Sequence, residues 1–412
     1  MILYCMEDFK KAFEKLMSKK CIQILRERCH SILKKLKILH LIKSLGRGGA
    51  EKLIPQTAAL HNKDQFEFFC LYFFHQENNI IDELEDSGIQ VFHLPSGNLG
   101  LFFQVKKVRD FVATHQIDII HAHLPWAGIL ARLAGKEMEV PIVYTEHNTW
   151  DRYNLFSYWG NRLTFKQQDA AIAVSNEVSL SMQLNLIFDP LKIPGRMRLY
   201  SIPNGVNTEE FQRSWEDRET IRKAWKIPLD AFVVGKVAVF RSQKRLWIWV
   251  EQALEILKKT PQTHFLLVGD GDWRSRILSQ IKSSGKAANF HWAGVQKEVR
   301  PFLSAMDLYM SSSEFEGLPI AMLEAMACHL PVVATRAGGI GEVITHGVEG
   351  YLCEIEDYQQ LAPLALKIIQ DPDLHQSFSQ AARQRVVQDF SMQQMVKALE
   401  TVYFQVLEKS EL

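Results

Sequence analysis

The sequence predicts an α/β protein built from two doubly wound, Rossmann-like domains. Short apolar runs typical of buried strands alternate with amphipathic helical stretches, and this alternation indicates mostly parallel sheets covered on both faces. A polar, charged stretch, Thr208–Lys226, interrupts the alternation, which then restarts. A chain of 412 residues is also too long for one ordinary hydrophobic core and suits two domains.

The expected strands fall into two sets. Those of the first domain are Ile38–Ile42, Phe66–Phe73, Ile117–Ile120, Ile142–Tyr144, Ala171–Val174 and Leu199–Ile202. Amphipathic stretches such as Leu101–Thr114 and Ala127–Gly135 lie between them. Those of the second domain are Phe232–Phe240, His264–Val268, Leu308–Ser311 and Pro331–Ala334. Open parallel sheets bind ligands beyond the carboxyl ends of their strands, so two facing sheets predict a cleft between the domains.

These patterns divide the chain into four segments. They are a basic extension (1–36), a first domain (37–207), a second domain (208–389) and a terminal segment (390–412) with apolar residues at helical spacing. The extension carries nine Lys and Arg against four Asp and Glu and contains no Gly or Pro, which favours a helical arm. Two interpretations of this arm stay open: a solvated extension, or a surface that binds a membrane or a partner.

The composition excludes several classes of protein. Hydrophobic content of 47% and charged content of 23% are typical of a soluble globular protein, and a net charge of +1 gives no overall argument for nucleic acid. The six cysteines are scattered without a CxxC pair, which indicates reduced thiols. No apolar run approaches the roughly 18–20 residues that span a bilayer, and the N-terminus lacks the pattern of a signal peptide. We therefore expect a cytoplasmic protein.

The most informative motif is Glu316-Gly-Leu-Pro-Ile-Ala-Met-Leu-Glu324, which sets two carboxylates across an expected loop-to-helix junction. Pro319 suits the first helical turn, because the amide it lacks would be unpaired there. Glu324 then lies about one and a half turns inside the helix, and Glu316 stays in the loop. The amides of Gly317 and Leu318 near the helix terminus favour a phosphate. The two acids either bracket a nucleotide diphosphate, one near a sugar and one near the ribose, or are ordinary surface glutamates.

A glycine-rich turn, Ser44–Glu51, follows the first strand and opens the first helix. Gly46, Gly48 and Gly49 permit close approach of the backbone to a ligand, and the helix terminus favours an anion. Their spacing differs from the GxGxxG pattern of dinucleotide binding. A purely structural turn is the alternative.

Other candidate side chains also follow strand ends. His121 and His123 follow one expected strand and His147 follows the next. A metal site is one interpretation of these histidines, but no companion ligands keep zinc-like spacing, and a structural role is the other. Arg241 and Lys244 stand where a strand gives way to a helix, and such a cationic pair suits the charge of a diphosphate. Solvated surface charges are the alternative for this pair.

Six motifs occur in the order found in one enzyme family. They are Ser44-Leu-Gly-Arg-Gly-Gly-Ala-Glu51, Thr145-Glu-His147, Ile202-Pro-Asn-Gly-Val-Asn207, Val268-Gly-Asp-Gly271, Ser311–Ala327 with Pro331–Thr335, and Gly338-Gly-Ile-Gly-Glu342. Through them, residues 37 to 409 resemble the retaining glycosyltransferases of family 4, which have GT-B architecture with a glycogen-synthase-like donor domain. The resemblance implies an acceptor-side first domain, a donor-binding second domain, and a C-terminal helix that crosses back to the first.

The resemblance also implies roles for single residues. His147 would contact the donor sugar, while Gly48 and Gly49 line the cleft beside the donor phosphates and the acceptor. The turn Ala293-Gly-Val295-Gln296 would hold the nucleobase through backbone groups. Glu316 would orient the hydroxyls of the donor, and Glu324 would hold its ribose.

One position departs from the family pattern. The family arginine stands five residues before Lys244, where this chain has Val239. On an extended strand Arg241 would share the face of Val239, because side chains of a strand alternate. We therefore expect Arg241 to replace the family arginine, with Lys244 as the second catalytic cation.

The implied activity is retaining transfer of a sugar from a UDP- or GDP-sugar to a glycan or lipid-linked acceptor, in polysaccharide or lipopolysaccharide biosynthesis. The departing phosphate would itself accept the proton of the acceptor, so no side-chain base is required. Lys244, Arg241 and the helix-terminal amides would bind the donor phosphates, so we expect no metal, and we expect no cofactor. Contact of the basic extension with the inner face of the cytoplasmic membrane is a further expectation. The alternatives are a nucleotide-sugar epimerase or phosphorylase on a similar fold, and a catalytically silent sugar-nucleotide-binding protein.

Overall fold

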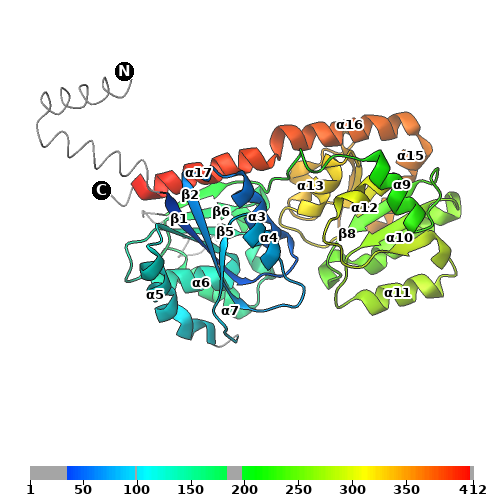
Figure 1. Ribbon diagram of the computed structural model, residues 1–412. Helices are drawn as coiled ribbons and strands as arrows, with labels where there is room; N and C mark the ends of the chain where they lie inside the picture. Colours follow the sequence, from blue (N-terminus) through cyan, green and yellow to red (C-terminus); the bar gives the residue numbers. More distant parts are fainter. Residues whose placement is uncertain (1–34, 98–99, 183–196, 409–412) are drawn as a thin grey trace, which may run out of the picture.

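The computed structural model of the protein describes residues 35–97, 100–182 and 197–408. Two parallel sheets lie side by side, each flanked by helices (Figure 1). The expected arm over residues 1–36 falls outside the described residues except for its last two positions. Within the described ranges, no helix has the length and apolar character that a membrane span requires.

The first sheet has seven strands in the order β3-β2-β1-β4-β5-β6-β7. Their bounds are β1 Leu36–Ser44, β2 Phe66–Phe74, β3 Gln90–His93, β4 Ile119–His123, β5 Ile142–Glu146, β6 Ala170–Ala173 and β7 Arg198–Ser201. The inner strands β1 and β2 are mostly apolar and are buried along most of their length, as expected for a sheet covered on both faces. The sequence did not predict β3, because this edge strand is only four residues long and has exposed polar residues at both ends.

The second sheet has six strands in the order β10-β9-β8-β11-β12-β13. Their bounds are β8 Val233–Val237, β9 His264–Val268, β10 Phe290–Trp292, β11 Leu308–Ser311, β12 Val332–Thr335 and β13 Gly350–Cys353. The short edge strands β10 and β13 were not predicted. Strand β8 ends at Val237, three residues before the expected end at Phe240, and this difference matters for Arg241 below.

Helices cover both faces of each sheet. In the first half they are α3 Gly49–Leu60, α4 Ile81–Asp86, α5 Val105–His115, α6 Leu124–Gly135, α7 Leu155–Thr164 and α8 Asn176–Met182, with the 3₁₀ turns η1 Gly100–Gln104 and η2 Trp150–Arg152. In the second half they are α9 Trp215–Ala224, α10 Leu246–Lys259, α11 Arg274–Ser283, α12 Arg300–Ala305, α13 Ile320–Ala327, α14 Ile340–Val343, α15 Leu361–Gln370 and α16 Pro372–Asp389, with η3 Ser242–Lys244, η4 Ala287–Asn289 and η5 Tyr358–Gln360.

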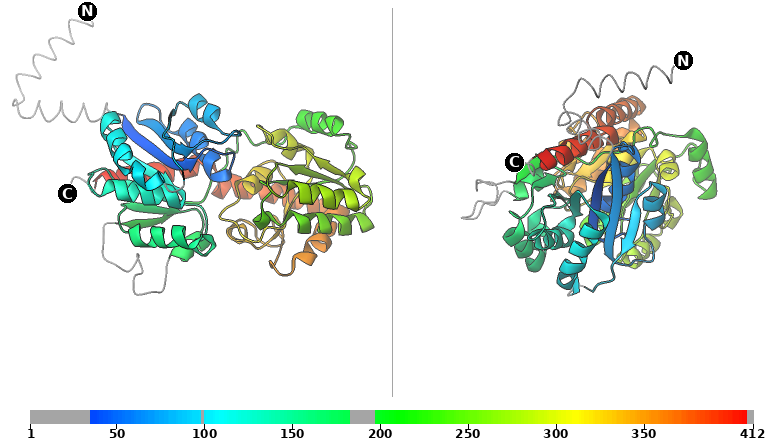
Figure 2. Two further views of the ribbon diagram at one scale, coloured as in Figure 1. Left: turned by 90° about the horizontal axis from the view of Figure 1, so that it is seen from below. Right: turned by 60° about the vertical axis from the view of Figure 1, so that its left-hand side comes forward.

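The C-terminal helix α17 (Met392–Glu408) follows α16 and returns to the first sheet, where it packs on α3 (Figures 1 and 2). Its buried residues Val396, Leu399 and Tyr403 join the apolar cluster that holds β1 and β2. The connection between the domains passes the junction of α16 and α17, where Val206 pairs with Ser391. This arrangement confirms the expected crossing back of the terminal segment.

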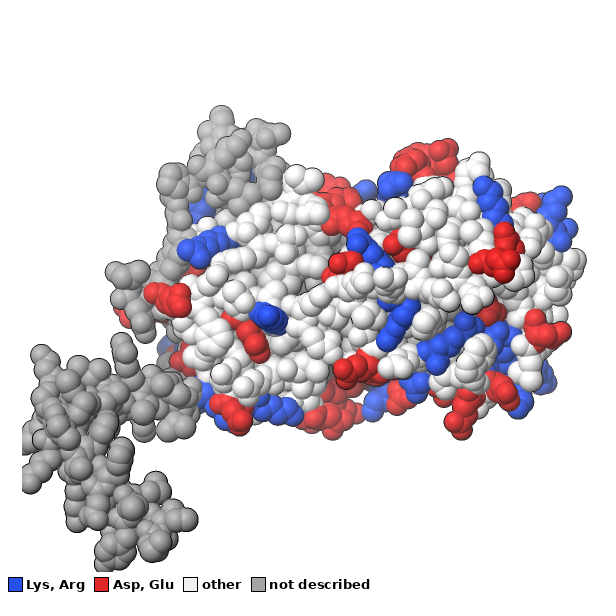
Figure 3. Space-filling view, turned by 90° about the horizontal axis from the view of Figure 1, so that it is seen from above, with Lys and Arg blue, Asp and Glu red and all other residues white. Residues whose placement is uncertain are grey.

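Acidic and basic side chains are interspersed over the face seen in Figure 3. This mixture of signs agrees with the net charge of +1.

Candidate active site

The loop between β11 and α13 carries Glu316 and leads into the helix that carries Glu324. Helix α13 begins at Ile320, so Pro319 precedes the helix and is not in its first turn as predicted, since its ψ of 109° is extended. The carbonyl of Leu318 accepts a hydrogen bond from Asn204 Nδ2 at 2.9 Å. This bond ties the donor loop, residues 312–319, to the connection between the domains.

Two glycines allow backbone contacts that hold the donor loop. A Cβ on Gly317 would lie 2.0 Å from the carbonyl oxygen of His147, which belongs to the first domain. A Cβ on Gly338 would lie 1.9 Å from the carbonyl oxygen of Glu316, and its φ of +59° also favours glycine. Any side chain at either position would force backbone apart. The two domains therefore touch directly at Gly317 and His147.

Glu316 is buried, with 7% of its surface exposed. Lys244 Nζ lies 2.6 Å from each of its carboxylate oxygens, and Ser313 Oγ donates to Oε1 at 2.7 Å. Burial opposes ionisation, but the charges of Lys244 and Lys236 and these hydrogen bonds hold the pKa of Glu316 below its usual value. Glu316 is therefore an ionised hydrogen-bond acceptor fixed in place, which the solvated-glutamate interpretation does not fit.

Lys236 on β8 is a residue of this site that the sequence did not predict. It is 3% exposed, and its Nζ donates to Ser311 Oγ at 2.7 Å. Ser311 Oγ lies 3.2 Å from Ser313 Oγ, so hydrogen bonds connect Lys236 to Glu316 through two serines. Burial lowers the pKa of Lys236 to about 7, although the charge of Glu316 opposes this shift. The only signal in the sequence was a lysine inside an apolar strand.

Glu324 lies in the second turn of α13 and is 4% exposed. Burial raises its pKa to about 7, and the nearby charge of Lys52 on α3 opposes the shift. A buried carboxyl facing a cation of the other domain is not an ordinary surface residue. A ligand hydroxyl that binds the carboxyl of Glu324 would replace the hydrogen bonds to water that the carboxyl loses on burial.

The glycine-rich turn of the first domain faces this helix. Gly48 is the residue before α3, and a Cβ on Gly49 would lie 3.2 Å from Ile320 Cδ1 at the start of α13. The N-termini of α3 and α13 therefore meet across the cleft. Glu51 lies in the first turn of α3. Burial raises the pKa of Glu51, and the charge of Arg241 opposes this shift.

The backbone between Val239 and Arg241 differs from the extended strand that the sequence predicted. Beyond β8 the amide of Arg241 donates to the carbonyl of Val239 at 2.8 Å, which closes a three-residue turn. The chain is therefore not extended here, and the predicted shared strand face of Val239 and Arg241 does not exist. Arg241 is exposed and lies near Glu51 of the first domain. Arg245 turns away from Glu316, and its guanidinium donates to the carbonyls of Ser312 and Ile355.

His147 follows β5 and is 8% exposed. Among the described residues, neither of its ring nitrogens has a hydrogen-bond partner, and burial lowers its pKa to about 4. The adjacent Glu146 holds the loop by accepting hydrogen bonds from Tyr144 Oη at 2.6 Å and Trp150 Nε1 at 2.9 Å. A neutral imidazole with two unused nitrogens, fixed beside the donor loop, can bind a hydroxyl group.

His40, His121 and His123 form a buried cluster whose nitrogens lie within 4.8 Å of one another. The rings of His121 and His123 stack at 4.3 Å with 28° between their planes, and Nδ1 of His40 lies 3.0 Å from Nε2 of His123, at hydrogen-bond distance. Both nitrogens of His121 are also occupied, by Tyr403 Oη and Thr145 Oγ1 at 2.7 Å each. These hydrogen bonds favour the structural interpretation of the histidines over a metal site.

The turn that includes Val295 follows β10 at the edge of the second sheet. Gly294 accepts a hydrogen bond from the amide of Gly269 at 2.7 Å, and Val295 is 47% exposed. The structure thus places the predicted nucleobase turn beside the turn that ends β9.

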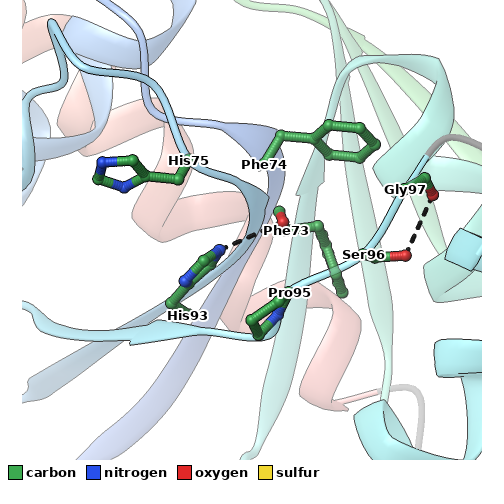
Figure 4. Close-up of a pocket in the computed structure, with 7 residues that line it drawn as sticks. All are labelled: Phe73, Phe74, His75, His93, Pro95, Ser96 and Gly97. Carbon is green, nitrogen blue, oxygen red and sulfur yellow. Dashed lines mark hydrogen bonds between the residues drawn. The ribbon is translucent and has the colours of Figure 1, made fainter.

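A hollow of about 470 Å³ opens at the carboxyl ends of β2 and β3 in the first domain (Figure 4). Its lining residues are Phe73, Phe74, His75, His93, Pro95, Ser96 and Gly97. His93 Nε2 lies 3.3 Å from the carbonyl oxygen of Phe73, which fixes the ring against the strand end. The sequence did not predict this hollow, because four of its seven lining residues belong to the unpredicted strand β3 or to the loop that follows it.

Two parallel-sheet domains, a lysine paired with the carboxylate of the donor loop and a returning C-terminal helix are the features of GT-B glycosyltransferases. Models of two glycosyltransferase families match consecutive parts of the chain. The model described as Glycosyltransferase Family 4 matches residues 47–210, and the one described as Glycosyl transferases group 1 matches residues 217–385. The chain belongs to glycosyltransferase family 4 and is a glycosyltransferase.

Curated relatives and solved structures agree with this assignment. The N-acetyl-alpha-D-glucosaminyl L-malate synthase of Bacillus anthracis is 29% identical over 337 residues, which are 80% of this chain and 85% of the relative. The UDP-Gal:alpha-D-GlcNAc-diphosphoundecaprenol alpha-1,3-galactosyltransferase of Escherichia coli is 23% identical over 391 residues, 90% of this chain and 98% of the relative. The structure of Anabaena Alr3699/HepE in complex with UDP-glucose is similar with a TM-score of 0.77 and 24% identity, covering 89% of this chain and 100% of that one. These relatives do not favour the epimerase, phosphorylase or silent-binder alternatives.

Proposed function

We propose that the protein is a retaining, metal-independent glycosyltransferase that transfers a sugar from a UDP- or GDP-sugar to a glycan or lipid-linked acceptor. The observation that carries this proposal is the Lys244–Glu316 pair, which holds the donor loop at the residue before Gly317, where that loop touches the backbone of His147. Groups that bind an anion and groups that bind hydroxyls thus meet in one place. Transfer from a sugar diphosphate needs both, because charge develops on the leaving phosphate.

In this proposal the second domain holds the donor. Lys244 has three N–H donors, of which two point at Glu316, so the third is left for a phosphate oxygen. The amides of Gly317 and Leu318 add positive potential at the start of α13. Glu324 binds the ribose, and the exposed cation Arg241 attracts the diphosphate from the mouth of the cleft.

The chemistry needs no side-chain base. The lowered pKa of Glu316 makes it a weak base, so it orients a sugar hydroxyl as an acceptor and does not take a proton. The bond from the anomeric carbon to the phosphate oxygen breaks, and the acceptor oxygen forms its bond on the same face. The departing phosphate takes the proton of the acceptor hydroxyl. His147, neutral at physiological pH, contacts a sugar hydroxyl through its unused nitrogens.

The relatives support particular first choices of substrate. The Anabaena structure contains UDP-glucose, and the Escherichia coli relative is named for an acceptor on diphosphoundecaprenol. We therefore place UDP-sugars first among donors and lipid-linked glycans first among acceptors, and we infer action at the cytoplasmic face of the membrane in polysaccharide or lipopolysaccharide assembly. The hollow at Phe73 and Phe74, on the acceptor side, is the candidate position for acceptor sugars.

The test is nucleoside diphosphate release from a panel of UDP- and GDP-sugars, with and without glycan acceptors, followed by NMR of the anomeric product. We expect release with at least one donor and a product of unchanged anomeric configuration. Glu316→Gln should abolish transfer, whereas Glu314→Gln, an exposed carboxylate in the same loop, should leave it intact. An inverted product would refute the retaining mechanism, and equal activity of the two variants would refute the assignment of Glu316.

A further inference from the structure

Helix α7 turns its large apolar side chains toward solvent. Leu155 is 77% exposed, Phe156 68%, Trp159 49% and Leu163 75%. At 3.6 residues per turn these four positions fall within an arc of about 100° around the helix axis. A surface helix of a soluble protein ordinarily has the opposite arrangement, with its apolar stripe against the core. We call these four residues the outward face of α7.

The inner side of the same helix is polar and fixed. Asn161 is fully buried, and its Oδ1 accepts a hydrogen bond at 2.9 Å from Nη1 of Arg132, which is itself fully buried. Ser157 is 3% exposed, and a Cβ on Gly160 would lie 2.7 Å from Ile129 Cδ1. Turning the helix to bury its apolar side would leave Arg132 short of a partner and push bulk into α6. The fold therefore keeps the outward face exposed. Exposing these apolar side chains to water costs free energy, and such an exposed apolar patch marks a site where another molecule binds.

Cations border the outward face. The guanidinium of Arg162 lies 5.3 Å from the ring centroid of Trp159, on the edge of the apolar arc. Lys166, two residues past the end of the helix, is exposed. The exposed acid Asp151 lies before the helix and is paired with Arg152 at 3.1 Å. Apolar and aromatic side chains edged by Arg and Lys are the composition of a helix that lies in the interface of an anionic lipid bilayer.

The outward face lies next to the cleft. Helix α7 follows η2, and Arg152 of that turn places its guanidinium 4.7 Å from the ring centroid of Phe315, the neighbour of Glu316. The α7 helix lies on the side of the first domain opposite to α17 (Figure 1). Phe156 also stacks on Trp126 at the start of α6, which extends the aromatic surface toward the strand ends. A membrane held at α7 would therefore lie close to the place of transfer.

We propose that the outward face of α7 docks on an anionic lipid bilayer and so presents the cleft to a membrane-borne acceptor. The proposal rests on the proposed function, in which the acceptor is lipid-linked. A second copy of the chain is a poorer occupant, because four side chains of one ten-residue helix cannot supply the roughly 800 Å² that each partner contributes to a stable protein interface. A bilayer needs no such area, since it accepts single aromatic and aliphatic side chains.

The test is co-sedimentation of the full chain with vesicles of phosphatidylcholine and phosphatidylglycerol. We expect Phe156→Ser with Leu163→Ser to weaken binding about tenfold or more, because two exposed apolar side chains lose their burial in the interface. Leu229→Ser, an equally apolar change at a residue 49% exposed in the other domain, should not weaken binding. Both proteins keep residues 1–36, so the difference reports on α7 alone. Equal vesicle binding of the double variant and wild type would overturn the proposal, as would a dimer in light scattering that the double variant abolishes.

Activity separates this proposal from the proposed function. Donor hydrolysis and transfer to a water-soluble acceptor should be the same in the double variant and wild type, whereas transfer to a long-chain acceptor embedded in vesicles should fall with binding. A loss on both acceptors with an unchanged melting temperature would contradict docking and place α7 in the active site. Absence of any turnover in wild type would refute the proposed function, while the vesicle measurement would still decide on the bilayer.

Discussion

Lys244 donates to both carboxylate oxygens of Glu316 at 2.6 Å, across 72 residues of sequence. The lysine ends the 3₁₀ turn η3 after β8, and the glutamate lies in the loop after β11, which is the neighbouring strand. The pair therefore forms only when the second sheet is assembled. It places an ionised acceptor and a cation at the point where the donor loop meets His147, and several expected outcomes depend on it.

Replacing Lys244 by Ala should lower the turnover rate about 100-fold, because one preorganised cation is lost from the leaving phosphate. It also leaves Glu316 buried without its main partner, so the melting temperature should fall. Arg245→Ala is the matched control, since its guanidinium binds the carbonyls of Ser312 and Ile355 and not Glu316. Steady-state kinetics of both variants would check this, and a crippled Arg245→Ala beside an active Lys244→Ala would reverse the assignment.

Glu324→Ala should weaken binding of UDP or GDP by roughly 1.5–3 kcal/mol, the usual contribution of a hydrogen bond to a charged group. Isothermal titration calorimetry with UDP, GDP and ADP measures this directly. Glu316→Gln should affect transfer more than binding of the free nucleotide, because it contacts the sugar in our proposal. Unchanged nucleotide affinity in Glu324→Ala would remove the ribose assignment.

Glu324 should also make the stability of the ligand-free protein depend on pH. Its folded pKa of about 7 lies above the unfolded value of 4.5, so its contribution is present below pH 4.5 and is lost as the pH rises through 7. The side chain in Glu324→Gln stays neutral. The free energy of unfolding of this variant should therefore rise relative to that of wild type between pH 5 and pH 8, by on the order of 3 kcal/mol at most. Thermal unfolding of both proteins across this range checks the sign. A stability advantage of the variant over wild type that becomes smaller with rising pH would contradict the burial of this carboxyl.

Lys236 should add a limb to the pH profile of turnover. Its folded pKa of about 7 lies below the unfolded value of 10.5, so the buried lysine loses its charge as the pH rises above 7. We expect kcat/KM to fall above pH 7, because one of the two cations that act on Glu316 disappears. Lys236→Met should have a lower value without this fall, whereas Lys236→Arg should keep the charge and move the fall to higher pH. Identical profiles for wild type and Lys236→Met would limit Lys236 to packing.

Transfer should persist in EDTA. The donor phosphates are assigned to Lys244, Arg241 and the amides before α13, so no divalent ion is needed to offset their charge. Complete loss of transfer in EDTA that Mg²⁺ or Mn²⁺ restores would contradict this assignment.

The sequence predicted the parts of this site that are local in the chain. The motif from Glu316 to Glu324 and the turn at Gly48 each predicted a loop that leads into a helix. The structure has helices α13 and α3 at these two places. Lys236 could not be predicted, because its importance comes from Ser311 on a neighbouring strand. Local spacing does not reveal which strands become neighbours.

The inverted helix α7 was unpredictable for a related reason. Its apolar residues show helical spacing, which ordinarily indicates the buried side. The polar side is buried because Arg132, 29 residues away in sequence, binds Asn161, and because Gly160 packs closely on Ile129. The same limit applies to Arg241, whose position followed from an assumed extended strand that a turn at Val239 replaces.

The exposed position of Arg241 reduces the effect that its replacement should have on turnover. An exposed cation such as Arg241 interacts more weakly with a phosphate than a buried one, since solvent screens the charge. We therefore expect Arg241→Ala to raise the KM for the donor and to lower kcat/KM by about tenfold, less than the loss at Lys244.

The charge of Arg241 also acts on Glu51 across the cleft. A donor diphosphate that draws Arg241 toward itself competes with Glu51, so Glu51→Gln should strengthen donor binding in wild type. The same change should have little effect once Arg241 is Ala, because the competition is then absent. Donor affinities of the two single variants and the double variant form a cycle that measures this coupling. Additive effects would mean that Arg241 and Glu51 act separately, and a fully active Arg241→Ala would leave Lys244 and Lys236 as the cations that replace the family arginine at Val239.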